Sequence, residues 1–346
     1  MGRRAASTEL RNVGALRAGV SLGLTGRYAV QARQAKAGLD LWVSDHDVEL
    51  VVVDDEGSPD RAVAAYQDLL DQRVEILLGP YGSGMVRRVA PVVCGAGRLL
   101  WNHGGAADDL ATPGLATVVA PASTYLHSLV ELARLVGLDE VVLVQGRGRF
   151  AAQVADGGIR AAHASGLRTR RIAPGERHDL AEPTVSLGAA SLLRSLLVFA
   201  GTFAEDVVAV RQLRQAGVAV GLVACVAAGI DEFGRRLGAL AEGVVGPAQW
   251  WSRDQSVAVG PSGPEFVRRF ESRFGHPPDY LAAQAAAAGY LATTAVARGY
   301  GPGDVERWRT DTLLGGFHLD RSWRQIGYTP IAVRWRRGRR VPTTTT

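Results

Sequence analysis

The stretch ILLGPYGSGMVRRVAP, residues 76–91, contains the signals from which the fold can be worked out. An apolar run ends at Gly79-Pro80, a Tyr-Gly-Ser-Gly turn follows, and a segment of helical character stops at Pro91. This order predicts a strand, a loop and the start of a helix. Free backbone N–H groups and the Ser83 hydroxyl would then lie at a positive helix end, a suitable place for a carboxylate or an amide. An ordinary strand-to-helix turn has the same features, so the neighbouring sequence has to distinguish the two.

Length and composition indicate a soluble globular protein with more than one lobe. The chain has 346 residues, which is long for a single hydrophobic core, and it is 47% hydrophobic and 21% charged. No apolar run reaches the roughly 18–20 residues that span a bilayer. The net charge of +5 falls to zero without five arginines near the C-terminus, at 334, 336, 337, 339 and 340. We expect these to form a solvated end, and we expect no nucleic-acid partner.

The two cysteines, Cys94 and Cys225, are far apart in the sequence and are expected to be free buried thiols. The spacing of Cys and His predicts no metal site, and no cofactor is expected. Residues 1–17 contain no apolar segment of an export signal. As it stands, the sequence therefore predicts a cytoplasmic protein, or an extracytoplasmic one if a signal has been omitted.

Strands and helices alternate twice along the chain, which predicts doubly wound α/β layers. The first series has strands at 16–24, 48–53, 76–78, 99–101 and 118–119, with helices at 29–43 and 61–72. Its β-branched run at 48–53 is expected to be buried on both faces of a parallel sheet. The second series has strands at 141–144, 169–172, 195–199, 220–226 and 244–245, with helices at 123–135, 151–164 and 205–216. Two helices, 264–274 and 280–298, and a strand at 331–335 follow.

Several short motifs, in this order and at these spacings, resemble those of the type I periplasmic-binding-protein superfamily. The nearest branch is the leucine/isoleucine/valine-binding group, which includes amide and urea receptors. The motifs are Leu24-Thr25-Gly26, Asp54-Asp55, Gly79-Pro80-Tyr81-Gly82-Ser83, Ala241-Glu242-Gly243-Val244 and Phe274-Gly275-His276-Pro277-Pro278-Asp279-Tyr280. The resemblance covers roughly residues 16–335.

The resemblance implies an α/β fold of two Rossmann-like lobes, each a doubly wound parallel sheet, joined by a three-segment hinge. Crossings are expected near 120–123, 246–250 and 325–330. Lobe 1 would contain 16–120 and 250–325, lobe 2 would contain 121–249 and 326–340, and 1–15 and 341–346 would be flexible termini. Trp250-Trp251 would either pack at the hinge or form a stacking wall at the mouth of the cleft.

The resemblance also implies where a ligand binds, between the lobes at the carboxyl ends of the strands. In relatives, the loop matching Tyr81-Gly82-Ser83 binds the ligand head group, and the loop matching Gly104-Gly105-Ala106 supplies backbone donors. Relatives usually carry Ser or Thr near Ala106, so only main-chain contacts are expected there. Phe150 and Phe203 lie near positions where relatives carry aromatic residues on the second lobe. The candidate set is completed by Tyr28 and His103, and it includes no catalytic or metal-binding residue.

One departure from the group concerns the ligand. Amino-acid receptors of the group carry an acidic residue near positions 224–226, which pairs with the α-ammonium of the ligand. Here no Asp or Glu lies between Asp206 and Asp231. A desolvated ammonium without a carboxylate partner is costly. The expected ligand is therefore an amide, a urea-like compound, an organic acid or an aromatic compound rather than a free amino acid.

The resemblance implies a solute-binding protein, monomeric or homodimeric, that closes over a small molecule and serves an ABC permease. One alternative is a cytoplasmic ligand sensor that controls a regulatory protein, which the missing export signal favours. Another is an enzyme in which Ser83 is the nucleophile, His103 the base and Asp108 the orienting residue. The sequence lacks the Gly-x-Ser-x-Gly elbow of such hydrolases. We therefore expect binding rather than catalysis.

Overall fold

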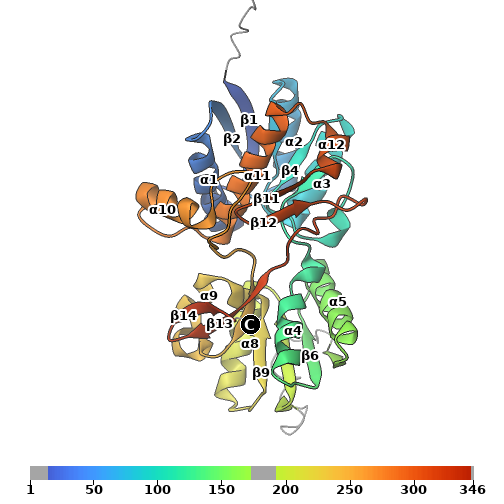
Figure 1. Cartoon of the computed structure of the whole chain (residues 1–346), viewed down its shortest axis with the longest axis vertical. Coiled ribbons are helices and arrows are strands. Elements are labelled where there is room, and N and C mark those ends of the chain that lie inside the picture. The colour runs from blue at the N-terminus through green and yellow to red at the C-terminus, as the bar shows by residue number, and fades with distance from the viewer. Residues whose placement is uncertain (1–14, 173–191, 344–346) are drawn as a thin grey trace, which may run out of the picture.

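The computed structural model describes residues 15–172 and 192–343 of the chain. Figure 1 shows two lobes arranged along the long axis, with chain segments crossing between them. Each lobe contains a sheet made largely of parallel strands and covered by helices, which is the predicted doubly wound α/β architecture. No helix in the described ranges is long and apolar enough to cross a membrane.

The first lobe is built on five parallel strands in the order β2-β1-β3-β4-β5. Its elements are β1 (Leu16–Leu22), α1 (Ala29–Val43), β2 (Val48–Asp54), α2 (Pro59–Asp71), β3 (Ile76–Leu78), α3 (Ser83–Gly95), β4 (Leu100–Asn102) and β5 (Leu115–Thr117). The fifth strand was predicted at 118–119 but lies three residues earlier. Leu115–Thr117 pair with β4, and the following residues lead out of the sheet.

The β-branched strand β2 is at the edge of this sheet, so the prediction that it is buried on both faces is wrong. It pairs with β1 alone among the described strands. Glu49 is exposed, and residues 51–53 are half-buried. β-branched side chains suit any half-buried pleated surface and do not specify a central position. The sheet order, which depends on distant segments, places β2 at the edge.

The second lobe contains a seven-stranded sheet in the order β14-β13-β10-β9-β8-β6-β7. Its elements are the 3-10 helix η3 (Ala122–Thr124), α4 (His127–Leu135), β6 (Glu140–Gln145), α5 (Arg149–Ala164), β7 (Arg168–Ile172), β8 (Ser195–Ala200), α8 (Phe203–Gln215), β9 (Leu222–Cys225), η4 (Val226–Gly229), α9 (Asp231–Leu237), η5 (Gly238–Ala241), β10 (Val245–Ala248), β13 (Ile331–Arg336) and β14 (Arg339–Pro342). The helix predicted at 123–135 is divided between η3 and α4.

The chain returns to the first lobe after β10. This part contains α10 (Gly263–Phe274), α11 (Tyr280–Ala297), α12 (Pro302–Arg307), β11 (Arg309–Thr312) and β12 (Gly315–His318). The alanine-rich helix α11 packs closely along α1, and glycines make the close approach possible. A Cβ atom on Gly38 would lie 2.0 Å from the carbonyl oxygen of Ala282. The two distant segments therefore share one hydrophobic core.

The chain crosses between the lobes after β5, after β10 and before β13, as the predicted fold requires. We propose that the lobe boundaries lie at 120, 249 and 325, where the sequence places them. Trp250 packs on the first-lobe core, with its ring 5.8 Å from Phe266 and its indole N–H donated to the Leu313 carbonyl. Of the expected flexible termini, residues 1–14 and 344–346 lie outside the described residues. Val341 and Pro342 belong to β14.

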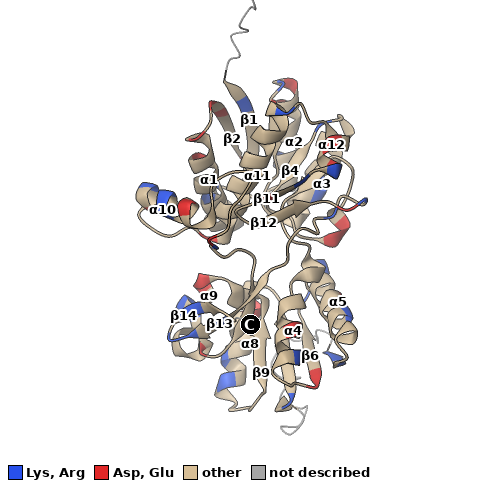
Figure 2. Cartoon of the chain, in the orientation of Figure 1, with Lys and Arg blue, Asp and Glu red and all other residues tan. Residues whose placement is uncertain are grey.

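The arginine-rich C-terminal segment forms the antiparallel hairpin β13–β14. Arg336, Arg337 and Arg339 are exposed, as expected of a solvated end, whereas Arg334 and Arg340 are partly buried. Arg340 is largely buried, pairs with Asp231 at 2.7 Å and lies over the ring of Trp251. Burial lowers the pKa of Arg334. Figure 2 shows charged residues of both signs on the helices of both lobes. The two cysteines are free thiols, as predicted, with Cys225 buried and Cys94 half-buried.

Candidate functional site

Residues 76–91 form the predicted strand, loop and helix start, but the predicted helix end at Pro91 is wrong, because α3 (Ser83–Gly95) continues through Pro91. β3 ends at Leu78, a loop follows, and α3 begins at Ser83. Gly82 precedes the helix with a φ of 99°, a conformation that side-chain-bearing residues rarely adopt. The first turn of a helix leaves its N–H groups without helical partners. Among the residues that the structure describes, no acceptor binds the N–H groups of Ser83 and Gly84. A ligand could therefore use both.

Asn102, at the end of β4, organises the second loop. Its Oδ1 accepts the N–H groups of Gly104 at 3.1 Å and Gly105 at 2.8 Å. Its Nδ2 donates to the Gly105 carbonyl and to the Thr117 hydroxyl. The two glycine N–H groups that the resemblance assigned to a ligand are thus already bonded. The Ala106 N–H makes no hydrogen bond within the described ranges, so it is the better candidate donor of this loop.

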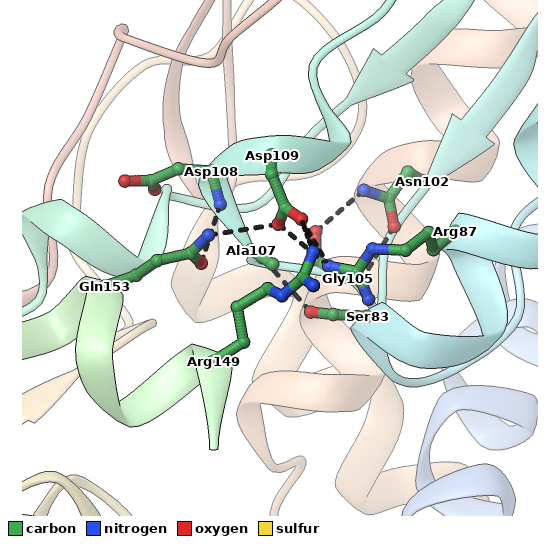
Figure 3. Close-up of polar contacts among 9 residues, drawn as sticks. All are labelled: Ser83, Arg87, Asn102, Gly105, Ala107, Asp108, Asp109, Arg149 and Gln153. Atoms are coloured by element: carbon green, nitrogen blue, oxygen red, sulfur yellow. Dashed lines mark hydrogen bonds and ion pairs between the residues drawn. The ribbon is translucent and has the colours of Figure 1, made fainter.

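The segment 81–84, which leads into α3, and the loop 104–107 after β4 contact each other directly. We call these two segments together the donor wall. The Gly82 N–H donates to the Gly104 carbonyl at 2.9 Å, and a Cβ atom on Gly104 would lie 2.6 Å from the Cα of Tyr81. The Ala107 N–H donates to the Ser83 Oγ at 3.1 Å (Figure 3). Ser83 accepts this bond with its oxygen, so its proton can still be donated to a ligand.

The catalytic alternative requires Ser83, His103 and Asp108 to be linked by hydrogen bonds, and they are not. His103 is fully buried, and neither ring nitrogen has a hydrogen-bond partner in the part of the chain that is described. Burial lowers the pKa of His103 to about 4, so the ring is neutral at pH 7. Asp108 accepts the Ser123 N–H. Ser83, His103 and Asp108 therefore do not form an activated nucleophile in this arrangement.

Three tyrosines, Tyr28, Tyr81 and Tyr280, lie at or beside the donor wall. The rings of Tyr28 and Tyr81 meet edge to face at 5.6 Å. Burial raises the pKa of Tyr81, and a hydrogen bond with the Tyr280 hydroxyl opposes the rise. Tyr280 was not among the predicted site residues, although it belongs to the motif at 274–280 that supported the family resemblance. The motif's position at the start of α11 was the available signal.

The two predicted aromatic residues of the second lobe lie in different places. Phe150 packs with the α4–α5 side of the sheet and meets Tyr125 edge to face at 5.5 Å. Phe203 packs with the cluster that contains Phe199 and Phe233, on the side of α8 and α9. Only Phe150 lies on the helix, α5, that also reaches the first-lobe loops.

Asp206, in the first turn of α8, is a buried carboxylate beside the loops where an ammonium partner was sought. It is fully buried and accepts the N–H groups of Gly201 and Ala227, each at 2.9 Å. Burial raises its pKa to about 7, although these hydrogen bonds oppose the rise. Through these two hydrogen bonds Asp206 holds the loops after β8 and β9, and because it is fully buried it is not exposed to a ligand.

A polar cluster joins the two lobes next to the donor wall (Figure 3). Asp109 lies in the 3-10 helix η2 (Asp108–Leu110) and binds Arg87 of α3 at 2.8 Å. Across the boundary, Arg149 of α5 binds Asp109 at 2.8 Å, and the Gln153 amide donates to Asp109 at 3.0 Å. Burial would raise the pKa of Asp109, but hydrogen bonds from Arg149, Gln153 and Arg87 outweigh it and hold the pKa far below its usual range. Sequence analysis did not identify this cluster, because its members are distant in the chain.

Two cavities lie near the crossings. One of about 490 Å³ lies where β10 and β13 separate, and Trp251, Asp311 and Tyr328 are among its lining residues. It shares no residue with the predicted site. The other holds about 10 Å³, enough for roughly one water, beside Ala106 and Pro121. Within the described ranges, no cluster of His, Cys, Asp and Glu could hold a metal ion.

The sequence matches a family model described as periplasmic binding protein over residues 15–322. No curated protein sequence matches significantly.

Solved structures are similar over nearly the whole chain. A leucine binding protein from Thermotoga maritima is 17% identical, with a TM-score of 0.79 over 95% of this chain and 98% of that chain. A branched-chain amino acid transporter substrate binding protein from Streptococcus pneumoniae, in complex with isoleucine, is 16% identical, with a TM-score of 0.75 over 94% and 97%. A solute binding protein from Rhodopseudomonas palustris, in complex with 3,4-dihydroxybenzoic acid, is 15% identical, with a TM-score of 0.75 over 92% of both chains. At these identities the likeness shows the fold.

Proposed function

We propose that this chain, which belongs to the periplasmic binding protein family, is a solute receptor that closes its lobes over a small polar organic molecule. Its partner would be the permease of an ABC-type importer, and it would have no catalytic activity of its own. Ligand contacts with both lobes favour closure only to the extent that the ligand binds the closed form more tightly.

The donor wall of the first lobe is the observation that carries this proposal. The N–H groups of Ser83, Gly84 and Ala106 have no acceptor among the described residues, and with the Ser83 hydroxyl they belong to the first turn of α3 and to the loop after β4, which contact each other. They lie at the carboxyl ends of β3 and β4, where α/β folds bind ligands. Donors of this kind suit an oxygen-rich group such as a carboxylate or an amide carbonyl.

The side chains of the second lobe support a proposal for the ligand class. Asp206, the carboxylate near the loop after β9, is fully buried, and each of its oxygens accepts a backbone N–H group. An α-ammonium group would therefore lose its hydration without gaining this carboxylate as a partner. Tyr28, Tyr81 and Phe150 provide aromatic surface near the wall. We therefore propose an amide, a urea-like compound, an organic acid or an aromatic acid as the ligand. Structural neighbours include one bound to dihydroxybenzoate and one bound to benzoate.

Calorimetry with the purified chain tests the ligand class directly. Leucine, isoleucine, acetamide, urea, benzoate and 3,4-dihydroxybenzoate would be titrated under the same conditions. We expect binding of a carboxylate or amide that lacks an α-ammonium, and no heat with leucine. Tight leucine binding would overturn the proposed ligand class while leaving the receptor function intact.

We propose an extracytoplasmic location, where solute receptors of ABC importers meet their ligands. Fractionation of cells expressing the full natural gene, followed by detection of the chain with an antibody, tests this. A purely cytoplasmic protein that co-purifies with a regulator would favour the sensor alternative instead.

A further inference from the structure

The helix α5 connects the second lobe to the donor wall of the first. Its body packs on β6, β7 and β8 of the second sheet. In the middle of the helix, Gly157 lies against the first crossing, where a Cβ atom would be 1.9 Å from the Ser123 carbonyl oxygen. Gln153 and Arg149 lie one and two turns nearer the N-terminus, so they are about 6 and 12 Å along the helix from Gly157. Rotation about the crossing therefore displaces Arg149 most.

Gln153 makes two hydrogen bonds to consecutive residues of the first-lobe loop. Its Oε1 accepts the Asp108 N–H at 3.0 Å, and its Nε2 donates to the Asp109 Oδ1 at 3.0 Å. Arg149 adds an ion pair with the other Asp109 oxygen at 2.8 Å. Figure 3 shows both α5 side chains extending toward this loop. A single carboxamide thus holds one backbone group and one side chain of the opposite lobe.

The loop held by Gln153 also positions the candidate ligand donors. Ala107 directly precedes Asp108, and its N–H donates to the Ser83 hydroxyl oxygen. Ala106, with its unpaired N–H, directly precedes Ala107. Asp109 is bound from the other side by Arg87 of α3, the helix that begins at Ser83. A displacement of residues 108–109 would therefore also shift Ser83 and Ala106.

We propose that Gln153 and Arg149 are positioning residues that couple lobe closure to assembly of the donor wall. In the arrangement seen here, α5 holds residues 108–109, and these hold the 106–107 backbone against Ser83. When the lobes separate, Gln153 leaves the loop, and the donors lose their common orientation. Neither residue needs to touch the ligand. The coupling rests on the proposed function only for its ligand readout, because closure can be measured without a ligand.

Gln153→Leu removes both hydrogen bonds at similar size and is the main test. We expect the distance between spin labels on the two lobes of the ligand-free protein to become longer and broader than in the wild type. We expect about tenfold weaker affinity for whichever test solute the wild type binds. Arg149→Met should weaken affinity only about two- to threefold, because its pair is exposed, and the difference should shrink in high salt.

Gln153→Glu provides a rescue experiment. The introduced carboxylate can still accept the Asp108 N–H, but at pH 8 it repels Asp109. Near pH 5 it can take up a proton and donate to Asp109 as the native amide does. Arg149 and Arg87 also face this position and attract the ionised carboxylate, but neither replaces the donor that Asp109 loses. We expect a longer interlobe distance at pH 8 that shortens on acidification, without a comparable change in the wild type. A purely structural role for Gln153 would not produce this reversal.

Arg88→Met is the matched control, because Arg88 forms an exposed ion pair with Asp60 within the first lobe. It should change neither the interlobe distance nor the affinity. If both Gln153 variants had the same interlobe distance as the wild type, the proposed coupling would be overturned, even if their ligand affinity fell. If no solute binds the wild type, the proposed function fails, whereas the ligand-free distances still decide the coupling. If Gln153→Leu fails to fold, the Glu and Arg149 variants carry the test.

Discussion

Ala107 donates its backbone N–H to the Ser83 hydroxyl oxygen at 3.1 Å, across 24 residues of sequence. This bond joins the loop after β4 to the first turn of α3, so the donors of the two loops act as one wall. It also gives Ser83 two roles: its oxygen holds the neighbouring loop, and its proton remains available to a ligand.

Ser83→Ala should remove both roles. We expect ligand affinity to fall by about 1–2 kcal/mol, roughly five- to thirtyfold, because one ligand hydrogen bond and one loop bond are lost. Ser83→Thr keeps the hydroxyl and should bind nearly as well as the wild type. Calorimetry with whichever test solute the wild type binds measures both. Equal affinity in the wild type and Ser83→Ala would assign ligand binding to the backbone alone.

Asp206→Asn should change how stability depends on pH. The folded pKa of about 7 lies above the value of about 3.9 in an unfolded chain. The folded state therefore binds the extra proton between these values, and this contribution favours folding at low pH and is lost as pH rises through 7. The variant should lose this part of the pH dependence between pH 4 and 7. Urea unfolding at several pH values measures it, with the exposed Asp68→Asn as control. An unchanged slope in Asp206→Asn would contradict the prediction.

His103 should affect the pH dependence of stability in the opposite direction to Asp206. Burial lowers its pKa to about 4, whereas an unfolded histidine titrates near 6.5. Its contribution to stability is present above pH 6.5 and is lost as pH falls toward 4, because the unfolded state then binds the proton. His103→Leu should be less sensitive to acid over this range, and the exposed His276→Gln should behave like the wild type. NMR of the wild-type imidazole should show a neutral ring at pH 6, and a charged ring there would refute the assignment.

Gly38→Ala should destabilise the first lobe. The added Cβ would meet the Ala282 carbonyl oxygen at 2.0 Å, so α1 and α11 must move apart. We expect the free energy of unfolding to fall by about 3 kcal/mol. Gly95→Ala, at the end of α3, meets no atom within 4 Å and should stabilise by about 0.5 kcal/mol. Chemical unfolding of the two variants compares them, and equal stabilities would show that α1 and α11 do not need their close contact.

Local sequence determined the elements and the donor loop of this protein. The β3–α3 turn, the helix at 29–43 and the alternation that sets two α/β layers all follow from side-chain periodicity and turn chemistry, which act over a few residues. The unpaired N–H groups at Ser83 follow from the same local rules, because any helix leaves its first donors free.

Tertiary structure alone decided which of these elements meet. Nothing local to β2 shows that it is an edge strand, and nothing near Asp206 shows that its oxygens bind the N–H groups of Gly201 and Ala227. The contact of Gln153 with Asp109 spans 44 residues and depends on how one lobe is set against the other. Such pairings arise from sheet order and helix packing, which are set by the whole buried surface. A window of neighbouring residues carries no information about them.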